Sequence, residues 1–97
     1  MPTYIALCNF TEQGIRNVKD TTKRADAVRE AAKKRGVDMT HIFWTMGNHD
    51  LVTIIEAPDD AAATAFSLAV GAAGNIRTQT LRAHTKEEMD GILAKLG

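Results

Sequence analysis

The segments of this chain that are typical of β-strands carry apolar side chains on both faces. Successive side chains of a strand point to opposite sides, so a sheet with one wet face should alternate apolar and polar residues. We place the turn of the hairpin within "WTMGNHDLV" at Asn48-His49. One side of the hairpin then carries Ile42, Trp44, Met46, Leu51, Thr53 and Ile55. The other side carries His41, Phe43, Thr45, Val52, Ile54 and Glu56. Because exposed apolar surface costs about 25 cal/mol per Å², we expect another copy of the chain to cover the second face.

The residue pattern predicts the order of elements along the chain. Apolar residues recur every three or four positions between Ile15 and Ala32, as in a helix with one buried stripe, and Gly36 can take the left-handed conformation that ends it. Asp59 and Asp60 supply an N-cap and negative charge for a second long helix. The predicted strands are Thr3–Phe10, Thr40–Met46, Asp50–Ala57 and Ile76–His84, and the second helix is Asp60–Ala73.

A further helix is predicted at the carboxyl end. Thr85 and Glu88 form a capping box ahead of an apolar side that consists of Met89, Ile92, Leu93 and Leu96. The preceding order is strand, helix, strand, strand, helix, strand. Right-handed crossovers fold this order into a ferredoxin-like βαββαβ sandwich of the α+β class, with both helices on one face of an antiparallel sheet. No linker or repeat divides the chain, so we expect a single domain over residues 1–97.

The charge balance argues against nucleic acid and membrane partners. Twelve Lys and Arg residues balance twelve Asp and Glu residues, so no net field attracts a polyanion or an anionic membrane. The longest uncharged stretch, residues 61–76, is too short and too weakly apolar to span a bilayer. Cys8 is the single cysteine and no secretory leader opens the sequence, so we expect a protein of the reducing cytoplasm.

The second long helix gives independent support for self-association. Ala61–Ala73 contains no charged residue on any side, although the outward face of a surface helix normally carries solvating side chains. Its small residues also permit close approach of a neighbour. We therefore expect a homo-oligomer, either a dimer or a larger assembly.

The central hairpin contains three of the four candidate ligand-binding residues: Trp44, His49 and Asp50. Adjacent residues of a strand project to opposite sides, so His49 and Asp50 are poorly placed to form a catalytic couple within one chain. Gly47 and Asn48 instead favour a tight turn, in which Asp50 accepts backbone N–H groups and His49 lies partly exposed within reach of a second subunit. Trp44 fits a core or interface position, or a platform on which a ligand stacks.

The fourth candidate ligand-binding residue is Arg82 on the last predicted strand. Together with Arg77 it is able to anchor a carboxylate or a phosphate, although arginines on an exposed strand are commonly only solvated. No His-x-x-x-His or Cys-x-x-Cys pattern is present, so we expect neither a metal nor a cofactor. Cys8 is expected to pack as a small apolar residue. His41 and Glu56 fall opposite each other in the register above, which favours a cross-strand pair over a metal site.

Four stretches resemble the GYD domain family, small proteins named after a Gly-Tyr-Asp signature at the central hairpin. They are "YIALCNFT", "GIRNVKD", "MGNHDLVTIIEAPDD" and "GNIRTQTLRA", which span roughly Tyr4 to Ala83. The resemblance implies a ferredoxin-like fold of the dimeric α/β barrel group, in which two sheets pack face to face. It implies no established reaction. His49 stands in place of the signature tyrosine, so a role that needs a phenol is in doubt there.

These observations favour a small homo-oligomeric domain that binds a small ligand or a protein partner rather than catalysing a reaction. The alternative, by analogy with the fold, is a cofactor-independent oxygenase or a haem-using enzyme of the dimeric α/β barrel group. Such chemistry needs Asn, Trp or His side chains that converge on an apolar cavity, and the available residues are Asn9, Trp44 and His84. A third hypothesis is a purely structural assembly unit.

Overall fold

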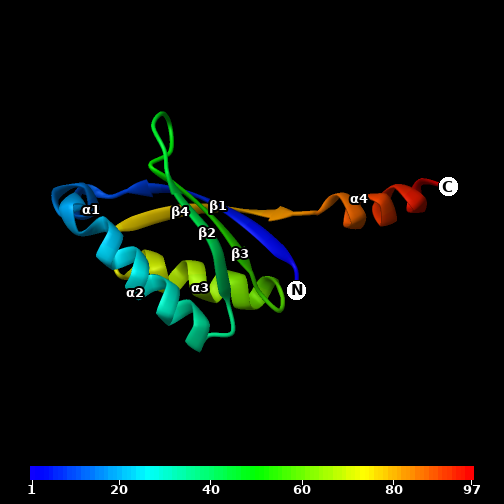
Figure 1. Ribbon diagram of the computed structural model, residues 1–97, viewed down its shortest axis with the longest axis horizontal. Coiled ribbons are helices and arrows are strands. Elements are labelled where there is room, and N and C mark those ends of the chain that lie inside the picture. The colour runs from blue at the N-terminus through cyan, green and yellow to red at the C-terminus, as the bar shows by residue number, and fades with distance from the viewer.

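A four-stranded antiparallel sheet with two long helices on one face forms the body of the protein in the computed structural model, which describes residues 1–97 (Figure 1). The strands are β1 (Thr3–Phe10), β2 (Asp38–Trp44), β3 (Leu51–Glu56) and β4 (Ile76–Ala83), in the sheet order β2-β3-β1-β4. The helices are α1 (Glu12–Arg16), α2 (Thr21–Lys34), α3 (Asp60–Ala72) and α4 (Lys86–Leu93), with 3-10 turns η1 (Val18–Asp20) and η2 (Ala94–Leu96). This arrangement confirms the predicted ferredoxin-like order with an additional carboxyl-terminal helix.

The helix ends follow the signals that the sequence carries. The Asp59 side chain accepts a hydrogen bond from the Ala62 backbone N–H at 2.8 Å and so caps α3. Gly36, with φ at +74°, lies two residues beyond α2 and turns the chain towards β2. None of the helices combines the length and the apolar character that a bilayer crossing requires.

The core lies between the two long helices and one face of the sheet. Ile55 and Val37 are its largest fully buried side chains, and Phe66 of α3 packs in the same cluster. A smaller cluster contains Cys8 and Leu51. Cys8 therefore packs as a small apolar residue, as predicted.

The β2–β3 hairpin confirms the predicted faces of the two strands but corrects their register. Trp44 pairs with Leu51, so the connection contains six residues, 45–50, instead of a two-residue turn. A bulge between Met39 and His41 shifts the pairing further along, and His41 lies opposite Ile54. The predicted pairing of His41 with Glu56 was wrong.

Contacts around the hairpin loop explain the different register. The Asp50 backbone N–H donates to the Cys8 carbonyl at 2.8 Å, so Asp50 is tied to β1 before β3 begins. Thr45 closes the loop through its N–H to the Asp50 carbonyl at 2.9 Å and through its hydroxyl to the His49 carbonyl at 2.6 Å. Met46, which the sequence pattern placed on the same face as Trp44, lies in this loop and is 98% exposed.

The second face of the sheet carries no helix (Figure 1), and we call it the open face. The strand register places six apolar side chains on it: Ile5, Leu7, Phe43, Val52, Ile54 and Leu81. Most are partly buried by their neighbours, but Phe43 is 52% and Leu81 41% exposed. One chain alone therefore leaves an apolar sheet face uncovered, whereas the predicted covering by a second copy stays a prediction.

Residues 85–97 extend away from the body as a helical segment, which we call the arm (Figure 1). Every residue from His84 to Gly97 is exposed. The predicted helix is therefore present, but its apolar side packs on no core of this chain.

Gly14 allows a close backbone approach that a stability measurement can test. A Cβ added at Gly14 would overlap the backbone carbonyl of Asn75, whereas one added at Gly91 in the exposed arm meets nothing within 4 Å. We expect Gly14→Ala to lower the free energy of unfolding by about 1–3 kcal/mol, because backbone must shift to make room. Gly91→Ala is the matched control, and denaturant titration is the measurement. Equal midpoints for Gly14→Ala and the unmodified chain would contradict the close approach.

Candidate binding surfaces

Trp44 ends β2 and lies on the side of the sheet that the helices cover. Its indole N–H donates to the Thr21 hydroxyl at the start of α2, at 3.0 Å. The indole is therefore held by a hydrogen bond, yet it remains 41% exposed. A fixed, half-exposed aromatic ring suits contact with another molecule, because little conformational entropy is lost when it is covered.

His49 and Asp50 hold the hairpin loop against β1 instead of forming a couple with each other. The Asp50 carboxylate accepts the Phe10 backbone N–H at 2.8 Å, which agrees with the predicted role of this residue as an acceptor of backbone N–H groups. The His49 Nδ1 atom lies 3.0 Å from the Asn9 side-chain oxygen. Asn9 in turn donates to the Asn48 carbonyl at 2.7 Å. Both side chains are half-buried and engaged, so they position the loop.

A groove of about 620 Å³ runs between α3 and β4, which is one of the two edge strands of the sheet. Its lining is mixed, with hydroxyl groups on both walls, and the Ser67 and Thr80 hydroxyl oxygens lie 3.2 Å apart across it. Leu68 contributes an apolar side chain that is 69% exposed. Arg77 and Arg82 supply positive charge. Such a lining offers hydrogen-bond donors and a cation, together with the hydrogen-bonded hydroxyl and carboxylate of Tyr4 and Asp60.

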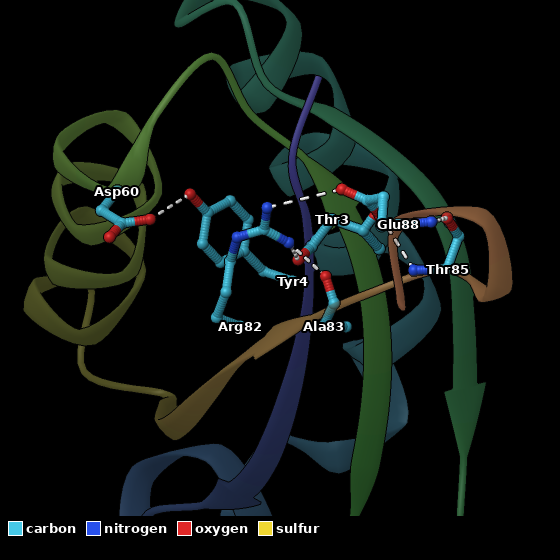
Figure 2. A network of polar contacts seen from close by, with 7 residues as sticks. All are labelled: Thr3, Tyr4, Asp60, Arg82, Ala83, Thr85 and Glu88. Carbon is cyan, nitrogen blue, oxygen red and sulfur yellow. Dashed lines mark hydrogen bonds and ion pairs between the residues drawn. The ribbon is translucent and has the colours of Figure 1, made fainter. Parts of the chain in front are cut away.

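Arg82 lines one end of this groove and is engaged by the chain itself (Figure 2). Its guanidinium donates to the backbone carbonyls of Thr3 and Ala83 and lies 3.6 Å from a carboxylate oxygen of Glu88. It also lies over the Tyr4 ring, 5.5 Å from the ring centroid. Arg82 thus connects β4, the start of β1 and the arm.

Tyr4 and Asp60 complete this network at the start of α3 (Figure 2). The Tyr4 hydroxyl donates to the Asp60 carboxylate at 2.5 Å. This hydrogen bond is the main reason that the pKa of the Tyr4 phenol is raised, with desolvation and the charge of Asp60 adding to it and Arg82 opposing it. The phenol therefore stays protonated at neutral pH. The sequence signals for this pair were a tyrosine in a buried strand, which needs a polar partner, and an acidic residue in the first turn of a helix.

The structure does not bring the four predicted binding residues together. Trp44 lies beside Leu51, which pairs with Cys8, whereas Arg82 pairs with Tyr4, four residues away along β1. At about 3.3 Å per residue this corresponds to roughly 13 Å. The hairpin and the Arg82 network are therefore two separate sites.

The residues considered for enzyme chemistry do not converge within one chain, because His84 lies far from Asn9 and Trp44. Asn9 lies at the hairpin end of the sheet, where it pairs with Arg77, and His84 follows β4 at the other end, where Ala83 pairs with Thr3. Burial raises the pKa of the Cys8 thiol to about 11, so it is not a nucleophile at neutral pH. No three His, Cys, Asp or Glu side chains gather where they could hold a metal ion.

Comparisons with known proteins agree with this architecture. The model of the GYD domain family matches residues 4–93. A Thermus thermophilus protein named "Glutamine synthetase and cystathionine beta-lyase binding protein" is 30% identical over 84 residues, which cover 86% of this chain and 88% of the relative. The crystal structure of TTHA0845 from the same organism superposes with a TM-score of 0.58 at 20% identity, over 88% of this chain and 95% of that one, and so shows the same fold.

The raised pKa of Cys8 predicts slow thiol chemistry in the folded protein. We expect a thiol reagent at pH 8 to label Cys8 far more slowly than in urea-unfolded protein, because the thiolate is scarce and the residue is buried. At a pH between the ordinary thiol pKa near 9 and the folded pKa of about 11, the Cys8 thiol keeps its proton only in the folded state. The contribution of Cys8 to stability is therefore present below pH 9 and lost as the pH rises through 11. Native labelling at the unfolded rate would contradict this environment.

Proposed function

The chain belongs to the GYD domain family, and from this premise we propose that it is a non-catalytic, self-associating protein that binds protein partners. The relative from Thermus thermophilus supports a protein-binding role through its name, which specifies glutamine synthetase and cystathionine β-lyase. The corresponding two enzymes of the organism that makes this chain are the first partners to test.

The observation that carries the proposal is that large apolar side chains are exposed, whereas polar side chains are bound to other parts of the chain. Large apolar side chains lie exposed on the open face and the hairpin, as Phe43 and Met46 illustrate. The polar groups instead join elements of the fold: the Asp50 carboxylate accepts a backbone N–H of β1, and the Tyr4 hydroxyl of β1 donates to Asp60 of α3. Exposed apolar patches mark interaction surfaces, whereas catalysis needs several acids, bases and nucleophiles that converge on one site.

We assign the contact with an enzyme partner to the helix-side surface of the hairpin. Trp44 is the contact residue there, because tryptophan is strongly enriched among residues that dominate binding energy. His49 and Asp50 act as positioning residues, since they fasten the loop that follows Trp44 to β1. Arg82 lies at the other end of the sheet and has a separate, structural part in holding the arm.

We assign self-association to the open face and not to the charge-free side of α3, because Leu68 is the single large apolar residue that α3 exposes. Complete burial of a large aliphatic side chain contributes about 1.5–3 kcal/mol, and several lie side by side here, with Ile54 between Ile5 and His41 on the neighbouring strands. Packing two copies face to face removes both apolar surfaces from water at once. The dimeric α/β barrel that the family resemblance implies would form in this way.

Partner binding is tested by titrating purified glutamine synthetase and cystathionine β-lyase against the chain in a calorimeter or on a biosensor. We expect saturable binding of at least one enzyme, and Trp44→Ser to weaken it on the order of tenfold or more, because it removes an anchoring ring. Leu68→Ser is the matched control, as Leu68 is an exposed apolar residue on α3. If the enzyme binds saturably and Trp44→Ser leaves the affinity unchanged, the hairpin is not the contact surface. If neither enzyme binds, these two enzymes are not the partners.

Self-association is tested by sedimentation equilibrium at micromolar concentration. We expect at least a dimer, and we expect Ile54→Asp to yield a folded monomer, because a carboxylate on the open face is hydrated in one chain but desolvated between two. Leu68→Asp is expected to leave the mass unchanged. A monomeric unmodified chain would contradict the proposed use of the open face.

A further inference from the structure

From the placement of the arm and the hairpin, we propose that the arm of each copy packs against the β2–β3 hairpin of a second copy. The contacting groups are the apolar side of the arm and the open side of the hairpin around Phe43 and Met46. This inference rests on the proposed self-association and adds a second, exchanged contact to it.

The arm is a helix with a defined start. The Thr85 hydroxyl accepts the Glu88 backbone N–H at 3.1 Å, and the Glu88 carboxylate accepts the Thr85 backbone N–H at 2.9 Å. Arg82 adds an ion pair to the same carboxylate, at 3.6 Å. These contacts fix the direction in which the arm leaves the body (Figure 2). A free, unstructured tail would need none of them.

The arm nevertheless has no support within its own chain. Lys86–Leu96 comprises eleven helical residues and is about 16 Å long. Isolated helices shorter than about 12–15 residues are only marginally stable in water. Its apolar residues recur at the spacing of one helix side and are all exposed: Met89 44%, Ile92 37%, Leu93 49% and Leu96 81%. A short amphipathic helix of this kind requires a surface on which to pack.

That surface does not belong to the same chain. Only His84 and Thr85 separate the end of β4 from α4, and the ion pair between Glu88 and Arg82 holds the first turn of α4 at the end of the sheet. Figure 1 shows the arm continuing outward from β4, away from both faces. The receiving surface must therefore come from another molecule.

A second copy of the chain carries a matching surface in the right place. The arm leaves the sheet where Ala83 pairs with Thr3, whereas the hairpin loop projects from the opposite end, next to the pair of Cys8 and Leu51. When two open faces meet about a two-fold axis that runs across the strands, the arm end of one copy lies over the hairpin end of the other. The arm starts at β4, whereas the hairpin joins β2 and β3 at the opposite edge of the sheet, roughly 12 Å away at about 4.8 Å per strand. An arm of about 16 Å that crosses the end of the partner's sheet spans this distance, and the contact forms twice.

The hairpin is apolar on the side that would receive the arm. Phe43 is 52% exposed, pairs with Val52 on the open face, and stacks on His41 with ring centroids 6.0 Å apart. Met46 at the loop is 98% exposed. Trp44 points to the other face, so the arm and an enzyme partner would use different sides of the same hairpin.

The inference is tested in the full-length chain with Leu93→Asp in the arm and Phe43→Asp on the hairpin, with Leu68→Asp as control. We expect each of the first two changes to raise the dimer dissociation constant on the order of tenfold or more, and the control to leave it unchanged. An equimolar mixture of the two variants should associate more tightly than either alone, because the mixed dimer regains one intact contact between an arm and a hairpin. Circular dichroism confirms that each variant is folded.

The outcomes separate this inference from the proposed self-association. If the unmodified chain is a monomer, both are overturned. If it is a dimer that Ile54→Asp dissociates but Leu93→Asp leaves equally tight, self-association stands and the exchanged arm is overturned. If Leu93→Asp weakens only the binding of an enzyme partner, the arm faces that partner, which also overturns the exchange.

Discussion

The structure depends on one constraint: its sheet is apolar on both faces, but the chain supplies helices for only one. On the covered face, α2 and α3 bury Ile55, Val37 and Phe66 in a core of ordinary composition. On the open face, Ile54 and Leu7 have the same chemical character but no covering element. The net stability of a domain is only about 5–15 kcal/mol, so the free-energy cost of leaving several aliphatic side chains in water is a substantial fraction of that stability. The simplest arrangement that removes this cost is a pair of identical chains.

The polar side chains serve this architecture. At one end of the sheet, Asp50 and His49 fasten the hairpin to β1. At the other end, a series of contacts runs from Glu88 in the arm through Arg82 and Tyr4 to Asp60 at the start of α3. The two sets of contacts hold two projecting apolar segments, the hairpin and the arm, in defined positions. An apolar surface presented on an ordered segment binds more tightly than the same surface on a mobile one, because less conformational entropy is lost.

Elements that depend on local pattern were predictable from the sequence. Thr3–Phe10 is a strand with the predicted bounds, and the capping box of Thr85 and Glu88 is present. The hairpin register was not predictable, because it is set by hydrogen bonds between Asp50 and β1, a segment about forty residues earlier in the chain. Period-two alternation cannot detect a register change of two residues, since every side chain keeps its face.

In the candidate site, too, contacts between residues close in the sequence were predictable and contacts between distant residues were not. Trp44 and the loop after it lie close together, as their sequence proximity suggests, whereas Arg82 proved to belong to the other end of the sheet. Its partners Thr3 and Glu88 come from the two ends of the chain, which no spacing rule connects. The projection of the arm could not be read from its amphipathic pattern either, because the pattern indicates that a helix has an apolar side but not which molecule covers it.

The central claim is that the open face is buried in solution, and solvent paramagnetic relaxation of methyl groups measures this most directly. In methyl-labelled protein at a concentration where the assembly forms, the account predicts that a soluble paramagnetic probe broadens the Leu68 methyl signals on α3 and spares those of Leu7 and Ile54. On dilution below the dissociation constant, Leu7 and Ile54 should become sensitive as well. Equal broadening of all three residues at every concentration, with the fold intact, would show that the open face is wet and would contradict the account.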